Sequence, residues 1–387
     1  MFNKFYGKPA CCWVGILFFF FCAESQVRPK PVPIDLIAAP PVPLLPYAPS
    51  MLTNRIRTSE MLVPERDAAK VLNRPVNEVK RNIRYFDGLG RPLQSLEMQE
   101  GQALVTPCLH DRYGRMARKY LSFIVAGNDG RLVPDPFPKQ AAFCQTAFPE
   151  EAWFFHQTNY EASPGSQVMQ ELPPGNEWAG RGRGVSFKHE VNIAADSVRI
   201  WTVRNFDNYS GTGWYAPGTL FKTIVADEDG RLVIEFSDKS GKLLLKKVQL
   251  AENCSAGYQG WICTYFLYDH SGRLRCVLQP EGVLAVMKAQ WQLSDPVILA
   301  EQCFRYEYDP RGQVIRKQSP GSGESRMVYD ARGRMVLQQH ANMKGQWLYF
   351  TYDQLGRLLT SGLLNDSQSR SAHALKAAAA TQYPDLR

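Results

Sequence analysis

The sequence contains no apolar stretch long enough to cross a membrane. Its longest apolar run, residues 11–22, has 12 residues, whereas a transmembrane helix needs about 20. Lys4 and Lys8 precede this run, and small and polar residues (23–26) follow it. A positive segment, a short apolar core and small residues are typical of a cleaved secretory signal. We therefore expect residues 1–26 to direct export, and we expect no transmembrane span beyond this signal.

Two alternatives to a cleaved signal remain open. Cys22 could be lipidated, although Phe21 precedes it where a small residue is usual. The same segment could also remain as a short membrane anchor. In each case the rest of the chain is expected to be secreted or held at the cell surface.

Cysteine is scarce outside the signal. Six of the nine cysteines lie beyond residue 26, which is too few for a disulfide-built scaffold in a chain of 387 residues. Buried single cysteines are the expected state for most of them. Cys254 and Cys263 flank a Gly-containing loop (255–260) and are the best candidate for a disulfide. The six are Cys108, Cys144, Cys254, Cys263, Cys276 and Cys303.

Catalytic motifs are also absent from the sequence. It has no nucleophile elbow, no phosphate-binding loop and no H-E-x-x-H zinc motif, and its six histidines are scattered. Cys254, Cys263, His270 and Cys276 lack the close Cys pair of structural zinc sites. Residues 227–230 begin like a calcium loop, but Gly230 stands at position 4 rather than 6. We expect no catalytic, cofactor-binding or metal-binding residue, and no enzyme.

Positive charge is not concentrated in any segment. The 45 Lys and Arg exceed the 37 Asp and Glu by a formal charge of +8, spread along the chain. Nucleic-acid binding would need a basic cluster, so we expect no nucleic-acid partner. Many arginines follow a motif glycine, where we expect them to line a solvated face.

A short motif, Tyr-Asp-x-x-Gly-Arg, recurs through the chain. The Asp side chain can accept hydrogen bonds from amides two or more residues on, which starts a turn. The Gly supplies the positive φ of a type I turn followed by a bulge. Alternating apolar and polar residues flank the turns, so each unit is expected to be a β-hairpin that stacks on its neighbours. The copies are 85–91, 109–115, 268–273, 308–313, 329–334 and 352–357, with weaker copies at 227–231 and 238–242.

This repeat resembles the YD repeat of RHS (rearrangement hot spot) proteins. The upstream part resembles the N-terminal, DUF6443-like region of the secreted RHS proteins of Bacteroidetes-type bacteria, and the resemblance runs from about residue 70 to 362. It implies an all-β fold in which stacked hairpins form part of a spiralling shell. The strings that carry it are 83–94, 113–115, 119–121, 161–164, 173–178 and 246–250, together with the repeats.

The resemblance also implies a function and a partner. In such proteins the repeats enclose or present a C-terminal toxin or effector and carry an aspartyl self-cleavage site; we find a counterpart of neither in this sequence. We therefore expect a non-enzymatic exported structural protein. The alternative is a cell-surface module that binds carbohydrate or protein through the aromatic cluster at 143–155. The pattern stops after residue 364, so the chain looks truncated, with an open last strand prone to pairing.

The chain is expected to divide into five segments. Within them, helices are expected at 139–146, between 280 and 299, and at 372–380, and strands resume near 197–201. The segments are a signal (1–26), a Pro-rich linker and lead-in (27–75), a DUF6443-like domain (76–250), YD repeats (251–362) and a helix-prone tail (363–387).

Overall fold

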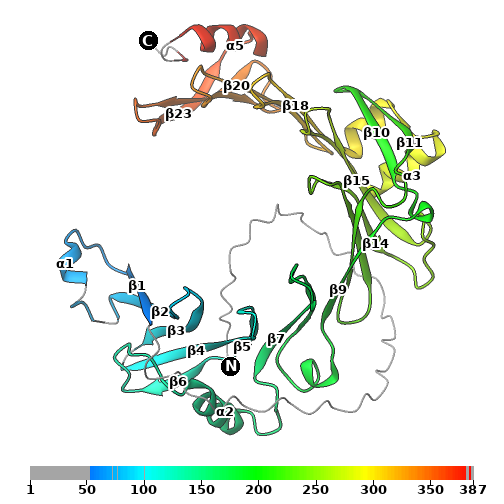
Figure 1. Ribbon diagram of the computed structural model, residues 1–387. Coiled ribbons are helices and arrows are strands. Elements are labelled where there is room, and N and C mark those ends of the chain that lie inside the picture. Colours follow the sequence, from blue (N-terminus) through cyan, green and yellow to red (C-terminus); the bar gives the residue numbers. More distant parts are fainter. Residues whose placement is uncertain (1–52, 72, 76, 100, 381–382, 385–387) are drawn as a thin grey trace. The chain divides into compact units, whose positions relative to one another are not determined.

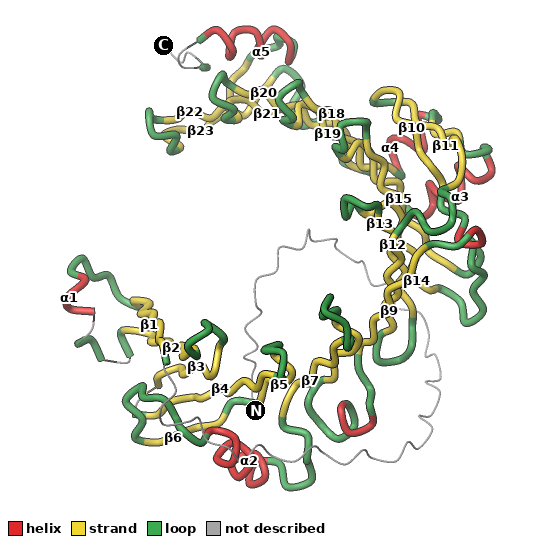
Figure 2. Tube along the Cα trace, viewed as in Figure 1, coloured by secondary structure: helices red, strands yellow, loops and turns green. Residues whose placement is uncertain are grey.

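The computed structural model describes residues 53–71, 73–75, 77–99, 101–380 and 383–384. The expected signal, most of the Pro-rich linker and Cys11, Cys12 and Cys22 lie outside the described residues. Figure 1 shows hairpin following hairpin along the chain, and Figure 2 shows how strongly strand dominates over helix. The fold is all-β apart from a few helices, as the repeat pattern predicts.

The strands of the main sheet are β1 (Asn54–Met61), β2 (Val79–Phe86), β3 (Pro92–Gln99), β4 (Gln102–His110), β5 (Met116–Tyr120), β6 (Phe123–Ala126), β7 (Phe155–Tyr160), β8 (Val168–Leu172), β9 (Val185–Val191), β12 (Phe221–Ala226), β13 (Leu232–Ser237), β14 (Leu243–Gln249), β15 (Trp261–Tyr268), β16 (Leu274–Leu278), β18 (Cys303–Tyr308), β19 (Val314–Ser319), β20 (Gly323–Tyr329), β21 (Met335–Gln339), β22 (Gln346–Tyr352) and β23 (Leu358–Asn365). A smaller sheet contains β10 (Arg199–Asn205), β11 (Asn208–Trp214) and β17 (Gln292–Leu293).

The helices are α1 (Ala68–Val71), α2 (Pro136–Ala147), α3 (Pro280–Lys288), α4 (Pro296–Glu301) and α5 (Arg370–Ala379), with 3-10 turns η1 (Ala179–Arg181) and η2 (Ala194–Asp196).

The main sheet has 20 strands, and all of its pairings are antiparallel. Each strand pairs with the next along the chain, with one exception: β5 and β6 both pair with β4, at different parts of that strand. The helices and the smaller sheet are inserted between strands of the main sheet. Antiparallel neighbours need only short turns, which is why a sequence of repeated turns builds one continuous ladder. The path is β1–β2–β3–β4–β5–β7–β8–β9–β12–β13–β14–β15–β16–β18–β19–β20–β21–β22–β23.

One strand lies within the segment described from the sequence only as a lead-in. β1 pairs with β2 along its whole length, from Asn54 opposite Phe86 to Met61 opposite Val79. From the sequence we assign no strand to this segment. β1 is an edge strand that is mostly exposed, so its sequence, NRIRTSEM, is polar and lacks the apolar alternation by which a strand is recognised.

The expected helices are present, with different bounds. The segment predicted at 139–146 is α2, which starts at Pro136 because Pro is tolerated in the first turn. The segment between 280 and 299 holds two helices, α3 and α4, on either side of the short strand β17. The tail forms α5, which packs against β20.

The apolar residues form four separate cores along the ladder. The largest lies between the main sheet and the smaller sheet with α3, around Phe236, Tyr265 and Leu278. A second is built by β2, β3, β4 and β6, a third by α2 with its neighbouring strands, and a fourth by β20 to β22 with α5. Several local cores, each formed by neighbouring elements, are typical of stacked repeats.

No helix among the described residues has the length and apolar character of a membrane span.

Candidate functional site

The repeated turns carry the most regular polar geometry in the chain. In the turn at Asp330, the backbone NH of Gly333 donates to the Asp330 carbonyl at 3.0 Å. The Asp330 Oδ1 accepts from the amides of Arg332 and Arg334, both at 2.9 Å. Gly333 has φ +81°, and the ladder register shifts between Val328 and Tyr329. This is the expected turn with a bulge.

All eight sequence copies adopt this turn. The two weaker copies, at Asp227 and Asp238, close the same backbone bonds to Gly230 and Gly241 as the strong copies do. A further hairpin turn, at Glu161, departs from the sequence pattern but joins β7 and β8 with the amide of Glu161 donating to the Gln167 carbonyl. The sequence reading missed this turn, because Glu replaces Asp and the spacing is longer.

Three junctions link one turn to the next by the same contacts. At the junction between β21 and β22, Arg334 donates from Nε to its own Asp330 (2.8 Å) and from Nη1 to the Asp353 carbonyl (3.1 Å). The guanidinium also lies 5.0 Å from the ring centre of Tyr352. The Tyr352 hydroxyl donates back to the Met335 carbonyl at 2.8 Å.

The same set recurs elsewhere in the ladder. At the junction between β16 and β18 the partners are Arg273, Asp309, Tyr308 and Leu274. At the junction between β5 and β7 they are Arg115, Glu161, Tyr160 and Met116. The motif Tyr and Arg thus act between hairpins, whereas the motif Asp and Gly act within one.

Arg115, Arg273 and Arg334 do not line a solvated face, so that expectation was wrong at these three positions, whereas Arg231 and Arg357 are exposed as expected. The exposed fractions of the side chains of Arg115, Arg273 and Arg334 are 17%, 31% and 21%. The reason is that the next hairpin covers them. Arg357, in the last repeat, is 74% exposed and bonds only to Asp353 among the described residues.

A lysine is fully buried beneath the largest core. The ammonium of Lys247 donates to the carbonyls of Asp196 (3.0 Å), Ala256 (2.8 Å) and Gly257 (2.8 Å). Burial lowers the pKa of Lys247 to about 8. The Asp196 carboxylate bonds to Lys222 at 2.9 Å. Since three carbonyls and a nearby carboxylate surround the charge, the group holds η2 and the 256–257 loop onto β14.

An aromatic stack lies beside this lysine. The Arg199 guanidinium sits 3.6 Å from the ring centre of Trp214 and 4.7 Å from that of Trp291. The Tyr258 and Tyr265 hydroxyls are 2.6 Å apart. Burial raises the pKa of both tyrosines, so they stay protonated and act as packing and hydrogen-bonding groups.

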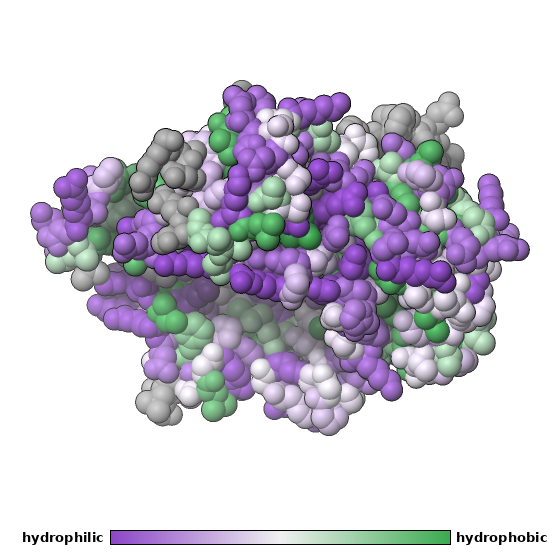
Figure 3. Space-filling view, turned by 90° about the horizontal axis from the view of Figure 1, so that it is seen from above, coloured by the Kyte–Doolittle hydropathy of each residue, from purple (hydrophilic) through white to green (hydrophobic). Residues whose placement is uncertain are grey.

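The structure does not place the aromatic residues at 143–155 together as a surface. Trp153, Phe154 and Phe155 are buried, and Trp153 and Phe155 pack with Tyr120 in the core beside α2. Phe143 and Phe148 are exposed. The expected binding cluster is therefore mainly core. In Figure 3 the hydrophobic residues of the visible face are scattered among hydrophilic ones.

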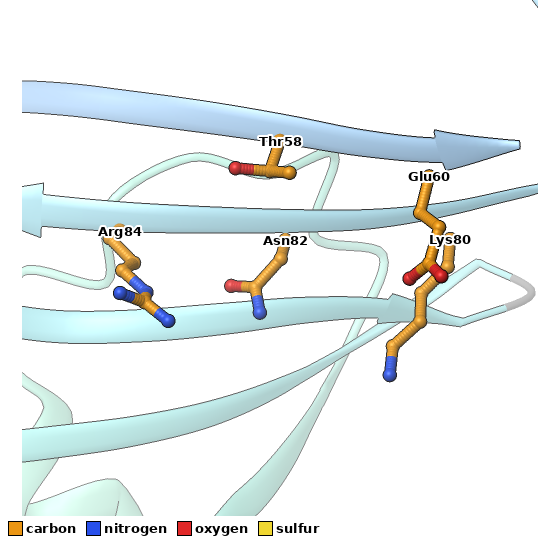
Figure 4. Close-up of a pocket in the computed structure, with 5 residues that line it drawn as sticks. All are labelled: Thr58, Glu60, Lys80, Asn82 and Arg84. Atoms are coloured by element: carbon orange, nitrogen blue, oxygen red, sulfur yellow. The ribbon is translucent and has the colours of Figure 1, made fainter. Parts of the chain in front are cut away.

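A shallow polar cavity of about 160 Å³ lies at the first strand pair. Lys80, Asn82 and Arg84 point to the same side of β2, with Thr58 and Glu60 from β1 beside them (Figure 4). Glu60 lies opposite Lys80, and Thr58 lies opposite Asn82. These residues alternate along the edge strand β1 and its neighbour β2, as the polar face of a sheet does.

The cysteine prediction is corrected in one respect. Cys254 and Cys263 do not form a disulfide. The Cys254 thiol donates to the Ala251 and Gly260 carbonyls, whereas Cys263 is buried on β15 opposite Lys247. Cys144, Cys263, Cys276 and Cys303 are buried and free, as expected for most. No cluster of potential metal ligands occurs among the described residues.

Comparison with known proteins gives one family match. Residues 57–191, about a third of the chain, match the family described as "Domain of unknown function (DUF6443)". The matched range covers β2 to β9 and the part of β1 from residue 57 on. No curated protein matches the chain.

Solved structures of toxin complexes show partial similarity. A crystal structure of TcdB2-TccC3-Cdc42 matches at 16% identity with a TM-score of 0.48, and covers 75% of this chain and 13% of that one. The structure of TcdB2-TccC3 without its hypervariable C-terminal region matches at 16% identity with a TM-score of 0.47, and the match covers 74% of this chain and 12% of that one. The Photorhabdus luminescens Tc holotoxin pore matches at 14% identity with a TM-score of 0.46, and the match covers 78% of this chain and 14% of that one. Similarity at this level says nothing about activity or partner.

Proposed function

We propose that this protein is an exported, non-enzymatic structural protein of the RHS type. Its stacked hairpins form part of a shell that encloses or presents a toxin or effector polypeptide. The observation that carries the proposal is the use of the motif side chains. Asp and Gly shape each turn, and Tyr and Arg link it to the next, so the repeated polar groups are engaged in building a continuous sheet.

The buried charges of the chain support the same role. Lys247 donates to three backbone carbonyls, and Arg305 donates to the Phe206 carbonyl at 3.0 Å and pairs with Asp207. These groups tie the smaller sheet and its loops to the main ladder. A long sheet assembled from such units would act as a structural barrier, and this role needs a continuous sheet and no catalytic centre.

The DUF6443 match at 57–191 supports a connection to the RHS type only through the resemblance of that region to secreted RHS proteins. It leaves the nature of the enclosed polypeptide open. The chain spans 12–14% of the toxin structures named above. We therefore propose that these hairpins contribute to a larger assembly, and that this assembly encloses the polypeptide.

A protease-protection experiment tests the proposal. The tagged protein is isolated from the culture fluid and from the cell surface of its source organism, then treated with a broad-specificity protease. We expect a co-purifying polypeptide that resists cleavage until the hairpins are unfolded with urea. Recovery from the cytoplasm alone, or recovery without any protected polypeptide, would contradict it.

A further inference from the structure

The shallow cavity at the first strand pair brings charges of both signs together on a small area. It has a volume of about 160 Å³ and is lined by Thr58 and Glu60 of β1 and by Lys80, Asn82 and Arg84 of β2. Alternate residues of a strand point to one face of the sheet, so the five side chains share a face. Figure 4 shows the Asn82 amide in the middle, with Arg84 on one side and Glu60 and Lys80 on the other.

The charged groups of this cavity have no protein partner. The side chains of Glu60, Lys80 and Arg84 make no hydrogen bond or ion pair with any residue that the structure describes, although Glu60 lies directly opposite Lys80. Opposite charges do pair at such facing positions elsewhere in the ladder, as Glu235 and Lys246 do at 3.2 Å. The three charged side chains of the cavity are exposed, so a ligand can reach them.

Asn82 carries a polar atom that the fold leaves unsatisfied. Its Oδ1 is buried and has no hydrogen-bond partner among the described residues, which is unfavourable for a buried acceptor. The amide offers one donor and one acceptor side by side, and its last bond rotates readily between two orientations. An α-amino acid presents the reverse pair on one carbon atom, an ammonium that donates and a carboxylate that accepts. The amide therefore matches the charged groups of a free amino acid.

The charges on either side of the amide extend this match. Arg84 can bind the α-carboxylate through two N–H groups, and Glu60 can accept from the ammonium. Glu97 of β3 lies opposite Asn82 outside the cavity lining, and its negative charge also favours an ammonium there. Lys80 then remains for a second anionic group. It lies four residues from Arg84, about 13 Å along the strand, and both side chains are long enough to reach towards each other.

The size and charge of the cavity restrict the ligand further. The cavity is smaller than the pockets of about 300–1,000 Å³ that hold drug-sized ligands, so the occupant is a small molecule. Two cationic side chains and one carboxylate line it, which gives a formal charge of +1. An amino acid with an acidic side chain carries a net charge of −1 at pH 7 and complements this lining.

We propose that this cavity binds a free α-amino acid with an acidic side chain. Arg84 and Asn82 hold its α-carboxylate, Asn82 and Glu60 hold its ammonium, and Lys80 holds the side-chain carboxylate. This inference stands on the side chains of β1 and β2 and does not depend on export or on the enclosure of an effector.

A ligand-observed NMR titration of the full chain at low salt tests the proposal. L-glutamate and L-aspartate are the probes, and we expect a dissociation constant of about 1 mM or lower for at least one of them. Three analogues each lack one charged group: glutamine lacks the side-chain carboxylate, glutarate lacks the ammonium and 4-aminobutyrate lacks the α-carboxylate. Each should bind at least about fivefold more weakly than glutamate, because one charged partner is left unpaired.

Variants assign each contact to a residue. Arg84→Ala and Asn82→Ala should each weaken glutamate binding about tenfold. Arg55→Ala removes an exposed arginine of β1 from outside the cavity lining and should leave binding unchanged. Glu60→Gln should weaken the binding of glutamate but not that of glutarate. Lys80→Ala should remove the preference for glutamate over glutamine.

Circular dichroism checks that each variant keeps its strand content. Glutarate binding as tight as glutamate binding, with no effect of Glu60→Gln on either, would overturn the proposal, because the cavity would then be a general anion-binding surface. Equal losses in Arg84→Ala and Arg55→Ala would overturn it too, since diffuse positive charge would explain them. Absence of binding by both acidic amino acids would show that the cavity is no ligand site.

Discussion

Each residue of the repeat has a separate physical task. Asp330 bonds to two amides of its own turn, Gly333 adopts a left-handed backbone, Arg334 reaches the next turn and Tyr352 reaches back. The eight copies preserve the first two tasks more strictly than the last two. The turn at Asp309, for example, has Gln313 in place of Arg, and its Nε2 donates to the Gly333 carbonyl instead.

Replacing Gly333 by Ala should destabilise the ladder locally. The residue has φ +81°, and an added Cβ would lie 3.0 Å from the Gln313 amide nitrogen. Left-handed backbone costs a non-glycine residue about 1–2 kcal/mol. Urea denaturation should show a loss of that size. Gly213→Ala is the control, since its backbone φ lies outside the positive range and its nearest neighbour is at 3.9 Å; an equal loss in both would count against the turn argument.

Replacing Arg334 by Ala should destabilise the chain by about 1–3 kcal/mol, because the side chain bonds to both Asp330 and Asp353 and covers the Tyr352 ring. Thermal unfolding measures the change. Arg357→Ala removes the same side chain from the turn at Asp353, where among the described residues it bonds only to Asp353, and should change the unfolding midpoint much less. Similar losses from both variants would show that the contact between hairpins is not the cause.

At the scale of elements, the hairpins lengthen the sheet, and the elements inserted between them cover one of its faces and form a core there. The smaller sheet, α3 and the loop at 251–260 pack on β12 to β16 and create the largest core. Successive residues of β14 point to opposite faces: Lys247 is buried among these elements, whereas Lys246 is 34% exposed and pairs with Glu235 at 3.2 Å.

Lys247→Met should destabilise the region by about 3 kcal/mol, because three buried carbonyls lose their donor. Hydrogen exchange should show faster exchange in β14, β15 and the 251–260 loop. The matched control is Lys246→Met on the opposite face of the same strand, which should change exchange little. Retention of full protection in Lys247→Met would refute the tethering role.

The attachment of α5 should depend on pH through His373. This side chain is fully buried, its Nδ1 lies 2.6 Å from the Tyr383 hydroxyl, and it packs on Trp347. Burial lowers the pKa of His373, with Lys376 adding to the effect and Asp366 opposing it. A depressed folded pKa means that the unfolded segment binds the proton more tightly. The stability of α5 should therefore fall as pH drops below about 6.5.

The measurement is hydrogen exchange of α5 amides at pH 5 and pH 7, corrected for the intrinsic rates. Wild type should lose protection at pH 5, and His373→Phe should show the same protection at both values. His340, which is exposed, serves as the control site. If the pH effect persists in His373→Phe, another group is responsible.

At the scale of the molecule, export is the feature on which the proposed role depends. The apolar run at 11–22 is the only feature of the sequence that we assign to export. Leu17→Arg places a charge in this run and should abolish export. A fusion of residues 1–60 to alkaline phosphatase, active only outside the cytoplasm, measures it. Unchanged phosphatase activity in Leu17→Arg, or inactivity of the unaltered fusion, would contradict a signal in this segment.

The sequence alone determined the turns, the strand directions and the all-β class, because Asp at the start of a turn and Gly at its left-handed position act within a few residues. It also predicted α2 and α5, though the bounds differ by a few residues. It could not show that Arg334 is covered, that Lys247 is buried, or that β1 is a strand. Those outcomes depend on which hairpin or loop lies beside each residue, and only the pairing of the strands decided that.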